Sequence, residues 1–194
     1  MPHLILLNGP PGSGKDTLAD AFASECNAEI VRLAEPLLSV AFAMFPHINA
    51  NNYNEMKSKI VTGDNAYESL SLREWIIMFA NDFAKRTLGK NVFADIAVDK
   101  IRNSSADTIV VVDLGFQEEL DELLAFVADA SANANSALMK VTLVRIHRDG
   151  CDYSSDSRSY LYADHFGVRN VDIENNGTKE EFEAYIDSIM HNAK

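Results

Sequence analysis

Residues 4–17 read Leu-Ile-Leu-Leu-Asn-Gly-Pro-Pro-Gly-Ser-Gly-Lys-Asp-Thr, an apolar run that leads into a glycine-rich loop with a lysine. The apolar run predicts a short buried strand over 3–8, and the amphipathic residues after the loop predict a helix over 15–26. Glycines between a strand and a helix let backbone N–H groups turn onto phosphate oxygens, and the lysine adds positive charge beside them. Residues 9–17 therefore predict a phosphate-binding loop that holds a nucleotide.

The position after the lysine departs from the general signature of such loops. That signature has Ser or Thr there to reach Mg²⁺, whereas this chain has Asp16 and places the hydroxyl one residue later, at Thr17. Two interpretations of Asp16 stay open. It is either an acid of the first helical turn, favoured by the helix dipole, or a carboxylate at the place where Mg²⁺ and the acceptor meet. The second is favoured, because a carboxylate beside a triphosphate is repelled unless a metal or a proton intervenes.

Composition limits the class of protein. A chain of 194 residues, 47% of them hydrophobic, predicts one domain with a full core. The net charge of −12 argues against polymeric nucleic acid as a partner but leaves a mononucleotide open. The two cysteines form no C-x-x-C pair, no signal peptide is visible, and no stretch approaches the roughly 20 apolar residues of a membrane span. We expect a cytoplasmic protein with no membrane partner; a monomer and a homodimer both stay open.

Strand and helix patterns alternate along the rest of the chain. Further strands are expected over 29–33, 108–113, 138–147 and 168–174. Helices are expected over 37–45, 55–60, 72–88, 92–102, 117–129 and after Thr178, and 130–137 reads as a polar loop. Five parallel strands with helical crossovers predict a doubly wound α/β sheet, in which ligands bind beyond the carboxyl ends of the strands.

Two polar residues follow predicted strands directly. Asp113 ends the most apolar strand, where a carboxylate beside a phosphate loop can hold Mg²⁺ or orient the attacking group. The alternative for Asp113 is a cap of the next helix. Asn175 follows the last strand, and its turn would lie next to the adenine of a bound ATP, although the same turn also serves to start the last helix at Thr178.

Arginines supply the fixed positive charge that phosphoryl transfer between two anions requires. Arg73 and Arg86 lie on the helix predicted over 72–88 and are expected to hold the acceptor phosphate. Arg148 and Arg158 flank a polar stretch between two strands, where a mobile lid is expected. Each arginine alone is more typical of a solvated surface charge, and only the group in an acidic protein indicates an anion site.

These motifs resemble those of nucleoside monophosphate kinases, and the Ser-Gly-Lys-Asp-Thr variant at 13–17 is most similar to the deoxynucleoside monophosphate kinases of bacteriophages. The resemblance implies a P-loop NTPase fold with three α/β/α layers, a central parallel sheet of about five strands, a helical acceptor-binding excursion and a lid. It implies a single kinase domain, 1–194, with its core at 1–46 and 104–194, the acceptor region at about 47–103 and the lid at about 148–166.

The resemblance also implies roles for particular residues, with ATP and Mg²⁺ as cofactors. The implied nucleotide-binding residues are Gly12, Ser13, Gly14, Lys15, Asp16, Thr17 and Asn175. The implied catalytic residues are Lys15, Asp16, Asp113, Arg148 and Arg158. The implied metal ligands are Asp16, Thr17 and Asp113. The implied acceptor-binding residues are Arg73, Asp82, Arg86, Phe116 and Glu119.

Two positions depart from the family pattern. Gly115 stands where the D-x-R-F-x-x-E segment of the family has an arginine, so one substrate-phosphate contact is missing or comes from elsewhere. Ser159-Tyr160-Leu161 lies where the lid of the family has a glutamate.

The sequence thus predicts ATP- and Mg²⁺-dependent phosphoryl transfer to a (deoxy)nucleoside monophosphate, giving the diphosphate for DNA synthesis. Three alternatives stay open. Ribose 1,5-bisphosphate kinase also resembles the Gly-Lys-Asp loop, and dephospho-coenzyme A kinase resembles the Asn-Gly turn at 176–177. The third is a nucleotide-binding regulator without turnover, for which Gly115 and the altered lid leave room.

Overall fold

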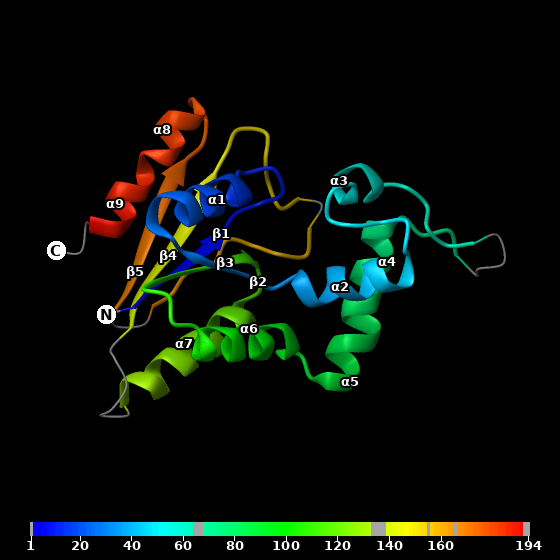
Figure 1. The fold of residues 1–194 in the computed structure, drawn as a ribbon, viewed down its shortest axis with the longest axis horizontal. Helices are drawn as coiled ribbons and strands as arrows, with labels where there is room; N and C mark the ends of the chain where they lie inside the picture. The colour runs from blue at the N-terminus through cyan, green and yellow to red at the C-terminus, as the bar shows by residue number, and fades with distance from the viewer. Residues whose placement is uncertain (1, 64–67, 133–138, 155, 165–166, 192–194) are drawn as a thin grey trace. The chain divides into compact units, whose positions relative to one another are not determined.

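The computed structural model describes residues 2–63, 68–132, 139–154, 156–164 and 167–191. At its centre lies a five-stranded, all-parallel sheet in the order β2-β3-β1-β4-β5 (Figure 1). The strands are β1 (His3–Asn8), β2 (Glu29–Arg32), β3 (Thr108–Leu114), β4 (Lys140–His147) and β5 (Val168–Glu174). β1 is buried along its whole length, as expected for the central strand of a sheet with helices on both faces. The predicted α/β fold class is confirmed.

Helices cover both faces of this sheet (Figure 1). α1 (Lys15–Cys26), α8 (Lys179–Glu183) and α9 (Tyr185–His191) lie on one face, and α6 (Val92–Asn103) and α7 (Gln117–Ala132) lie on the other. The core against α1 joins apolar side chains of the sheet to Phe22, Phe182 and Ile186. The helix expected after Thr178 is interrupted at Ala184, and apolar side chains of both parts, such as Phe182 and Ile189, pack in this core.

Parallel registers align the carboxyl ends of the strands at one edge of the sheet. Ile5 pairs with Val110 of β3 on one side and with Thr142 of β4 on the other. The register with β3 shifts between Leu6 and Asn8, so β3 carries an extra residue in a bulge just before its end. The bulge lies at the edge from which the phosphate loop leaves β1.

Residues Ala34–Phe93 form a second compact unit, which is described here by itself. Its elements are α2 (Glu35–Met44), α3 (Tyr53–Met56), α4 (Leu72–Met78), the π-helix η1 (Phe79–Lys85) and α5 (Arg86–Leu88). Its core joins Ala41 of α2 to Ile48, Leu72 and Ile76. Because α2 shares this core, the unit begins earlier than the excursion predicted at 47–103, and it ends at Phe93, near the start of α6.

Several predicted boundaries need correction. The helix predicted over 72–88 has its capping box at Ser71 and its end at Gly89, but its middle forms the π-helix η1. The helix predicted over 55–60 lies earlier, as α3, and Ile60 instead bridges to Ser71. α7 continues to Ala132, because alanines and a serine extend a helix readily; the remaining residues of the predicted loop, 133–137, lie outside the described residues. None of the helices described is long and apolar enough to cross a membrane.

Candidate phosphate-binding site

The loop between β1 and α1 has the backbone geometry of an anion cradle. Gly12 and Gly14 have φ values of 80° and 105°, a left-handed conformation that favours glycine. The Ser13 N–H donates to the Pro10 carbonyl at 3.2 Å. The Ser13 hydroxyl is fully buried and has no hydrogen-bond partner among the described residues. A buried hydroxyl left without a partner in such a loop fits a ligand with acceptor oxygens, such as a phosphate.

Lys15 is held beneath this loop by neutral partners. Its side chain is buried, and Nζ donates to the carbonyl oxygens of Gly9 at 2.6 Å and Pro10 at 2.8 Å. Burial lowers the pKa of Lys15, and the nearby Arg158 guanidinium lowers it further, whereas Asp113 opposes the shift. Because hydrogen bonds between two charged groups are stronger than those to neutral carbonyls, an anion can displace the two carbonyls from the ammonium.

Asp113 lies in the bulge near the carboxyl end of β3. It was predicted to be the last residue of this strand, but the strand continues to Leu114. The φ of Asp113, 71°, is unusual for a residue other than glycine. Burial raises the pKa of its carboxyl group, and the Asp16 carboxylate raises it further, while Lys15 and Arg32 act in the opposite direction. Backbone strain of this kind costs about 1–3 kcal/mol and concentrates at functional sites. The positive φ and the partly buried carboxyl group therefore mark Asp113 as a functional candidate.

Asp16 has a partner that the sequence did not suggest. The guanidinium of Arg32, the last residue of β2, forms an ion pair with the Asp16 carboxylate and lies 3.7 Å from Asp20. The Asp16 side chain is 72% exposed. The charge of Asp16, in the first turn of α1, is therefore matched by an arginine in this structure, and its role toward Mg²⁺ stays a prediction. Arg32 is a polar residue at the carboxyl end of a strand, which is the pattern that identified Asp113. No role was predicted for it from the sequence.

Residues that follow β4 and β5 contact the phosphate loop directly. Arg148 Nη1 donates to the Gly12 carbonyl at 3.1 Å, and Asn175 Nδ2 donates to the Ser13 carbonyl at 2.8 Å. The predicted gathering of polar residues at the carboxyl edge of the sheet is therefore observed. In this structure both side chains bind loop carbonyls and help to fix the loop conformation.

Arg158 comes from the segment between β4 and β5 and lies over Gly115. Its guanidinium forms two hydrogen bonds to Asp156, from Nε at 2.9 Å and from Nη2 at 2.6 Å, and these bonds raise the pKa of Arg158. A Cβ atom at position 115 would lie 2.5 Å from Cγ and 2.8 Å from Cβ of Arg158. The volume that a side chain at position 115 would fill is occupied by the stem of this arginine.

The remaining predicted residues are placed but not brought to the loop by any described contact. The buried Glu119 carboxylate accepts from the N–H groups of Gly115 at 3.4 Å and Phe116 at 3.3 Å, so it fixes the turn into α7. The acceptor-side residues of the second unit are exposed, at the start of α4, within η1 and at the start of α5: Arg73, Asp82 and Arg86. The acceptor-binding roles of all these residues stay predictions.

The donor atoms near the loop fit Mg²⁺ bound together with a nucleotide. Within the described part of the chain, no group of three or more His, Cys, Asp or Glu side chains could hold a metal ion alone. Mg²⁺ in nucleotide sites takes one or two carboxylates and completes its shell with phosphate oxygens and water. The predicted ligands Asp113, Asp16 and Thr17 carry donor atoms of this kind, and their binding of Mg²⁺ stays a prediction.

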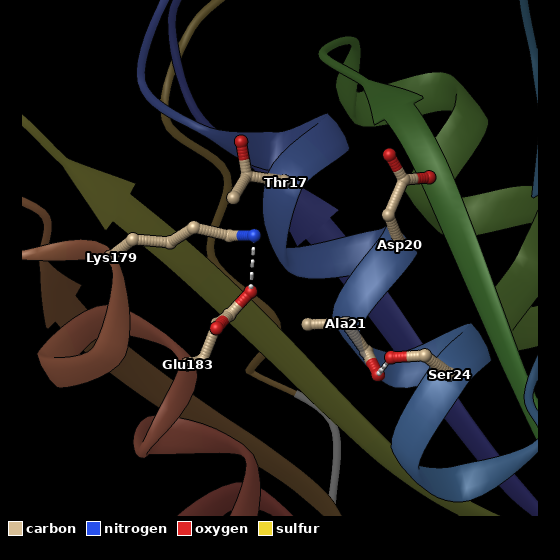
Figure 2. Close-up of a pocket in the computed structure, with 6 residues that line it drawn as sticks. All are labelled: Thr17, Asp20, Ala21, Ser24, Lys179 and Glu183. Atoms are coloured by element: carbon tan, nitrogen blue, oxygen red, sulfur yellow. Dashed lines mark hydrogen bonds and ion pairs between the residues drawn. The ribbon is translucent and has the colours of Figure 1, made fainter.

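A groove of about 410 Å³ runs along α1 beside α8 (Figure 2). Thr17 stands on its wall two residues after the loop lysine, and Lys179 on the facing helix pairs with Glu183 at 3.3 Å. The other residues that line the groove are Asp20, Ala21 and Ser24, so most of the lining side chains are polar. The lining has no aromatic side chain on which a base could stack, so the groove itself indicates no ligand.

Comparison with known proteins supports the fold. Residues 5–62 match the family model of ATPases associated with various cellular activities (AAA). No curated protein matches the sequence. A proposed kinase from Chloroflexus aurantiacus is similar in structure, with 13% identity, 98% of this chain and 99% of that chain covered, and a TM-score of 0.50. A sugar kinase from a Janibacter species (13% identity, 100% and 96% covered) and the APS kinase of Mycobacterium tuberculosis (12% identity, 98% of each) give TM-scores of 0.46 and 0.45. The loop, the parallel sheet, the family match over residues 5–62 and the structure with a TM-score of 0.50 define a P-loop NTPase fold.

Proposed function

We propose that this protein is a phosphotransferase that uses Mg²⁺ and ATP to convert a (deoxy)nucleoside monophosphate to the diphosphate, as the bacteriophage deoxynucleoside monophosphate kinases do. One observation carries the proposal. The buried Lys15 lies under the phosphate-binding loop, Asp113 has a positive φ at the end of the neighbouring strand β3, and Arg158 lies over Gly115, which follows that strand. Two cations and a carboxyl group at such a loop suit the transfer of a phosphoryl group better than the binding of an uncharged ligand.

Each residue has a distinct task in the proposed reaction. The loop N–H groups and Lys15 bind the β- and γ-phosphates of ATP. Arg158 stabilises the negative charge on the group in transfer, and Arg148 and Asn175 keep the loop in its binding conformation. Asp113, Asp16 and Thr17 are the candidate ligands of Mg²⁺, which when bound neutralises charge on the donor phosphates.

The transfer itself needs little covalent participation by the protein. An oxygen of the acceptor phosphate forms a bond to the γ-phosphorus while the bond from that phosphorus to the bridging oxygen breaks, and ADP leaves with the bonding electrons. Positioning and electrostatic stabilisation carry the rate. We assign the acceptor phosphate to Arg73 and Arg86 of the second unit, with Asp82, Phe116 and Glu119 as further acceptor-side residues.

The test is product analysis after incubation with Mg²⁺ and ATP. Each common ribo- and deoxyribonucleoside monophosphate is offered separately, together with ribose 1,5-bisphosphate and dephospho-coenzyme A, and ADP formation is followed. Diphosphate formed from at least one monophosphate supports the proposal. Turnover only with the sugar or coenzyme acceptor would assign another small-molecule kinase, and ATP binding without turnover on any acceptor would assign a regulator.

A pair of lysine variants makes the assay specific. Lys15→Ala removes the loop cation and should abolish ADP formation. Lys140→Ala is the matched control, because Lys140 begins β4 at the opposite end of the same sheet. If Lys15→Ala were as active as Lys140→Ala, the assignment of the ATP-binding site to the loop would be wrong.

A further inference from the structure

Asn8 is a fully buried polar residue to which the proposed reaction gives no task. It ends β1, and its Nδ2 lies 3.0 Å from the carbonyl oxygens of Leu114 and Ser159 and 3.1 Å from the Tyr153 hydroxyl. Its Oδ1 accepts from the Leu161 N–H at 3.1 Å. One amide side chain therefore joins the central strand to the end of β3 and to the segment that carries Arg158.

The residue after Arg158 is held from both sides. The Ser159 N–H donates to the Gly115 carbonyl at 3.1 Å, and the Ser159 carbonyl accepts from Asn8. Because both backbone groups of Ser159 are bound to the core of the same compact unit, the Cα atom of Arg158 has little freedom to move.

The rest of the segment is bound to the sheet as well. Residues 156–163 are here named the strap. The Leu161 carbonyl accepts from Nη1 of the buried Arg145 at 3.2 Å. The Ala163 backbone forms two hydrogen bonds with the Asn170 side chain, at 2.8 and 3.2 Å. Opening the strap as a lid would break these bonds and those to Asn8 together.

The side chain of Arg158 is confined at its two ends. Asp156 binds the guanidinium at two points, and the Asp156 side chain is only 7% exposed. The aliphatic stem lies in the volume left by the missing side chain of Gly115. The conformational entropy of this long side chain is therefore lost on folding and not at the moment of reaction.

We infer that Asn8 and Gly115 are positioning residues that hold Arg158 over Gly115, at the carboxyl edge of the sheet, before any ligand binds, and that the strap is a fixed element and not a closing lid. The role of Arg158 in this inference rests on the proposed function. The immobility of Arg158 does not, so the two can be tested separately.

The first measurement needs no turnover. The ¹⁵N heteronuclear NOE of the Arg158 Nε–H group reports motion on the picosecond to nanosecond timescale. In the ligand-free protein we expect a value as high as that of backbone amides in β1. Asn8→Asp replaces the amide donor with an oxygen that faces two carbonyls, and Gly115→Ala displaces the arginine stem from its place. Both variants should lower the NOE of Arg158 to the range of exposed arginines.

Thr142→Val is the matched control for loss of a buried hydrogen bond. The Thr142 hydroxyl bonds to His3 at 2.8 Å, near the amino-terminal end of β1. This variant should leave the Arg158 NOE unchanged even if it lowers the melting temperature. Should Asn8→Asp fail to fold, Gly115→Ala provides the same test, because Gly115 does not have a positive φ, so the cost of the added Cβ falls on its contact with Arg158.

The second measurement is turnover with the best acceptor from the product panel. A misplaced catalytic group costs up to about 100-fold in rate. We therefore expect Gly115→Ala to lower kcat by about 10- to 100-fold while the KM for ATP stays within about twofold, because the loop that binds ATP is untouched.

The outcomes distinguish the two proposals. A high Arg158 NOE in the wild type that falls in both variants and not in Thr142→Val supports the positioning role, whether or not turnover is found. A low wild-type NOE, or one that the variants do not change, overturns it. Absence of ADP formation by the wild type with every acceptor would overturn the proposed function alone.

Discussion

The stability of this fold should fall by about 2.5 kcal/mol between pH 7 and pH 4.5 through one histidine, with a limiting slope of about 1.4 kcal/mol per pH unit that applies only between its unfolded and folded pKa values. His3 begins β1, is 5% exposed, and shares a hydrogen bond with the buried Thr142. Burial lowers its pKa from 6.5 to about 4, and the charges of Lys140 and Arg169 act in the same direction. The folded chain therefore binds fewer protons than the unfolded chain between these two pH values.

The sign follows from proton binding. The contribution of His3 is fully present above pH 6.5 and is lost progressively as the pH falls toward about 4, because the unfolded chain takes up the proton that the folded chain refuses. The complete loss amounts to about 3 kcal/mol. Asp113 acts with the opposite sign, because burial raises the pKa of its carboxyl group, so the comparison needs a variant and not the wild type alone.

Urea unfolding at pH 7.0, 5.5 and 4.5 measures the effect. His3→Gln keeps an amide beside Thr142 and removes the titrating group. The free energy of unfolding of the wild type should fall by about 2.5 kcal/mol more than that of the variant over this range. Parallel pH dependences for the two proteins would show that the folded state accommodates a charged His3, and the burial assigned to this side chain would be wrong.

Further predictions concern the site. MgATP at 100 times its Kd should stabilise the wild type by about 2.7 kcal/mol in a thermal-shift experiment, and Lys15→Ala should lose this shift while it folds normally; a retained shift would contradict the loop assignment. Arg32→Ala should change the unfolding free energy by less than about 1 kcal/mol, because the Asp16 carboxylate that it pairs with is 72% exposed. Asp16→Asn should lower kcat far more than ATP affinity, and an unchanged kcat would leave Asp16 as a first-turn acid. Arg73→Ala should raise the KM for the monophosphate more than that for ATP, and the reverse order would exchange the two sites.

The parts of this structure that local sequence determines were predictable. The loop at 9–17 needs glycines where φ is positive, and the observed values at Gly12 and Gly14 bear this out. The capping boxes that begin α4 and α8 each lie within four residues, so Ser71 and Thr178 identify both helix starts. Alternation of apolar runs with amphipathic stretches was enough to predict five parallel strands, because each pattern reflects burial of one element.

Features that depend on distant partners were not predictable. Nothing in residues 79–85 marks the wider turn of η1, although Trp75, Phe79 and Phe83 stack along it with centroid distances of 5.4 and 5.2 Å. The ion pair of Arg32 with Asp16 joins the ends of two elements that only the folded sheet brings together. Asn8 was predicted only as the last residue of the first strand, and its four partners lie in segments far along the chain.

Gly115 shows that the residue type at a motif position does not by itself determine which side chain occupies that part of the site. Compared with the family pattern, a glycine at position 115 suggests that a contact with the substrate phosphate is lost. This was one reason to keep a nucleotide-binding regulator without turnover as an alternative. In the folded chain the stem of Arg158 fills the volume above Gly115, and an arginine at position 115 would compete with it for that volume. A cation can reach a phosphate from the segment at position 115 or from the strap. Stabilisation of the phosphate depends on where the positive charge lies in space, and not on which residue of the sequence carries it. Arg158 can take its place on the strap only because residue 115 has no side chain. Gly115→Ala is therefore a more informative variant than Gly115→Arg.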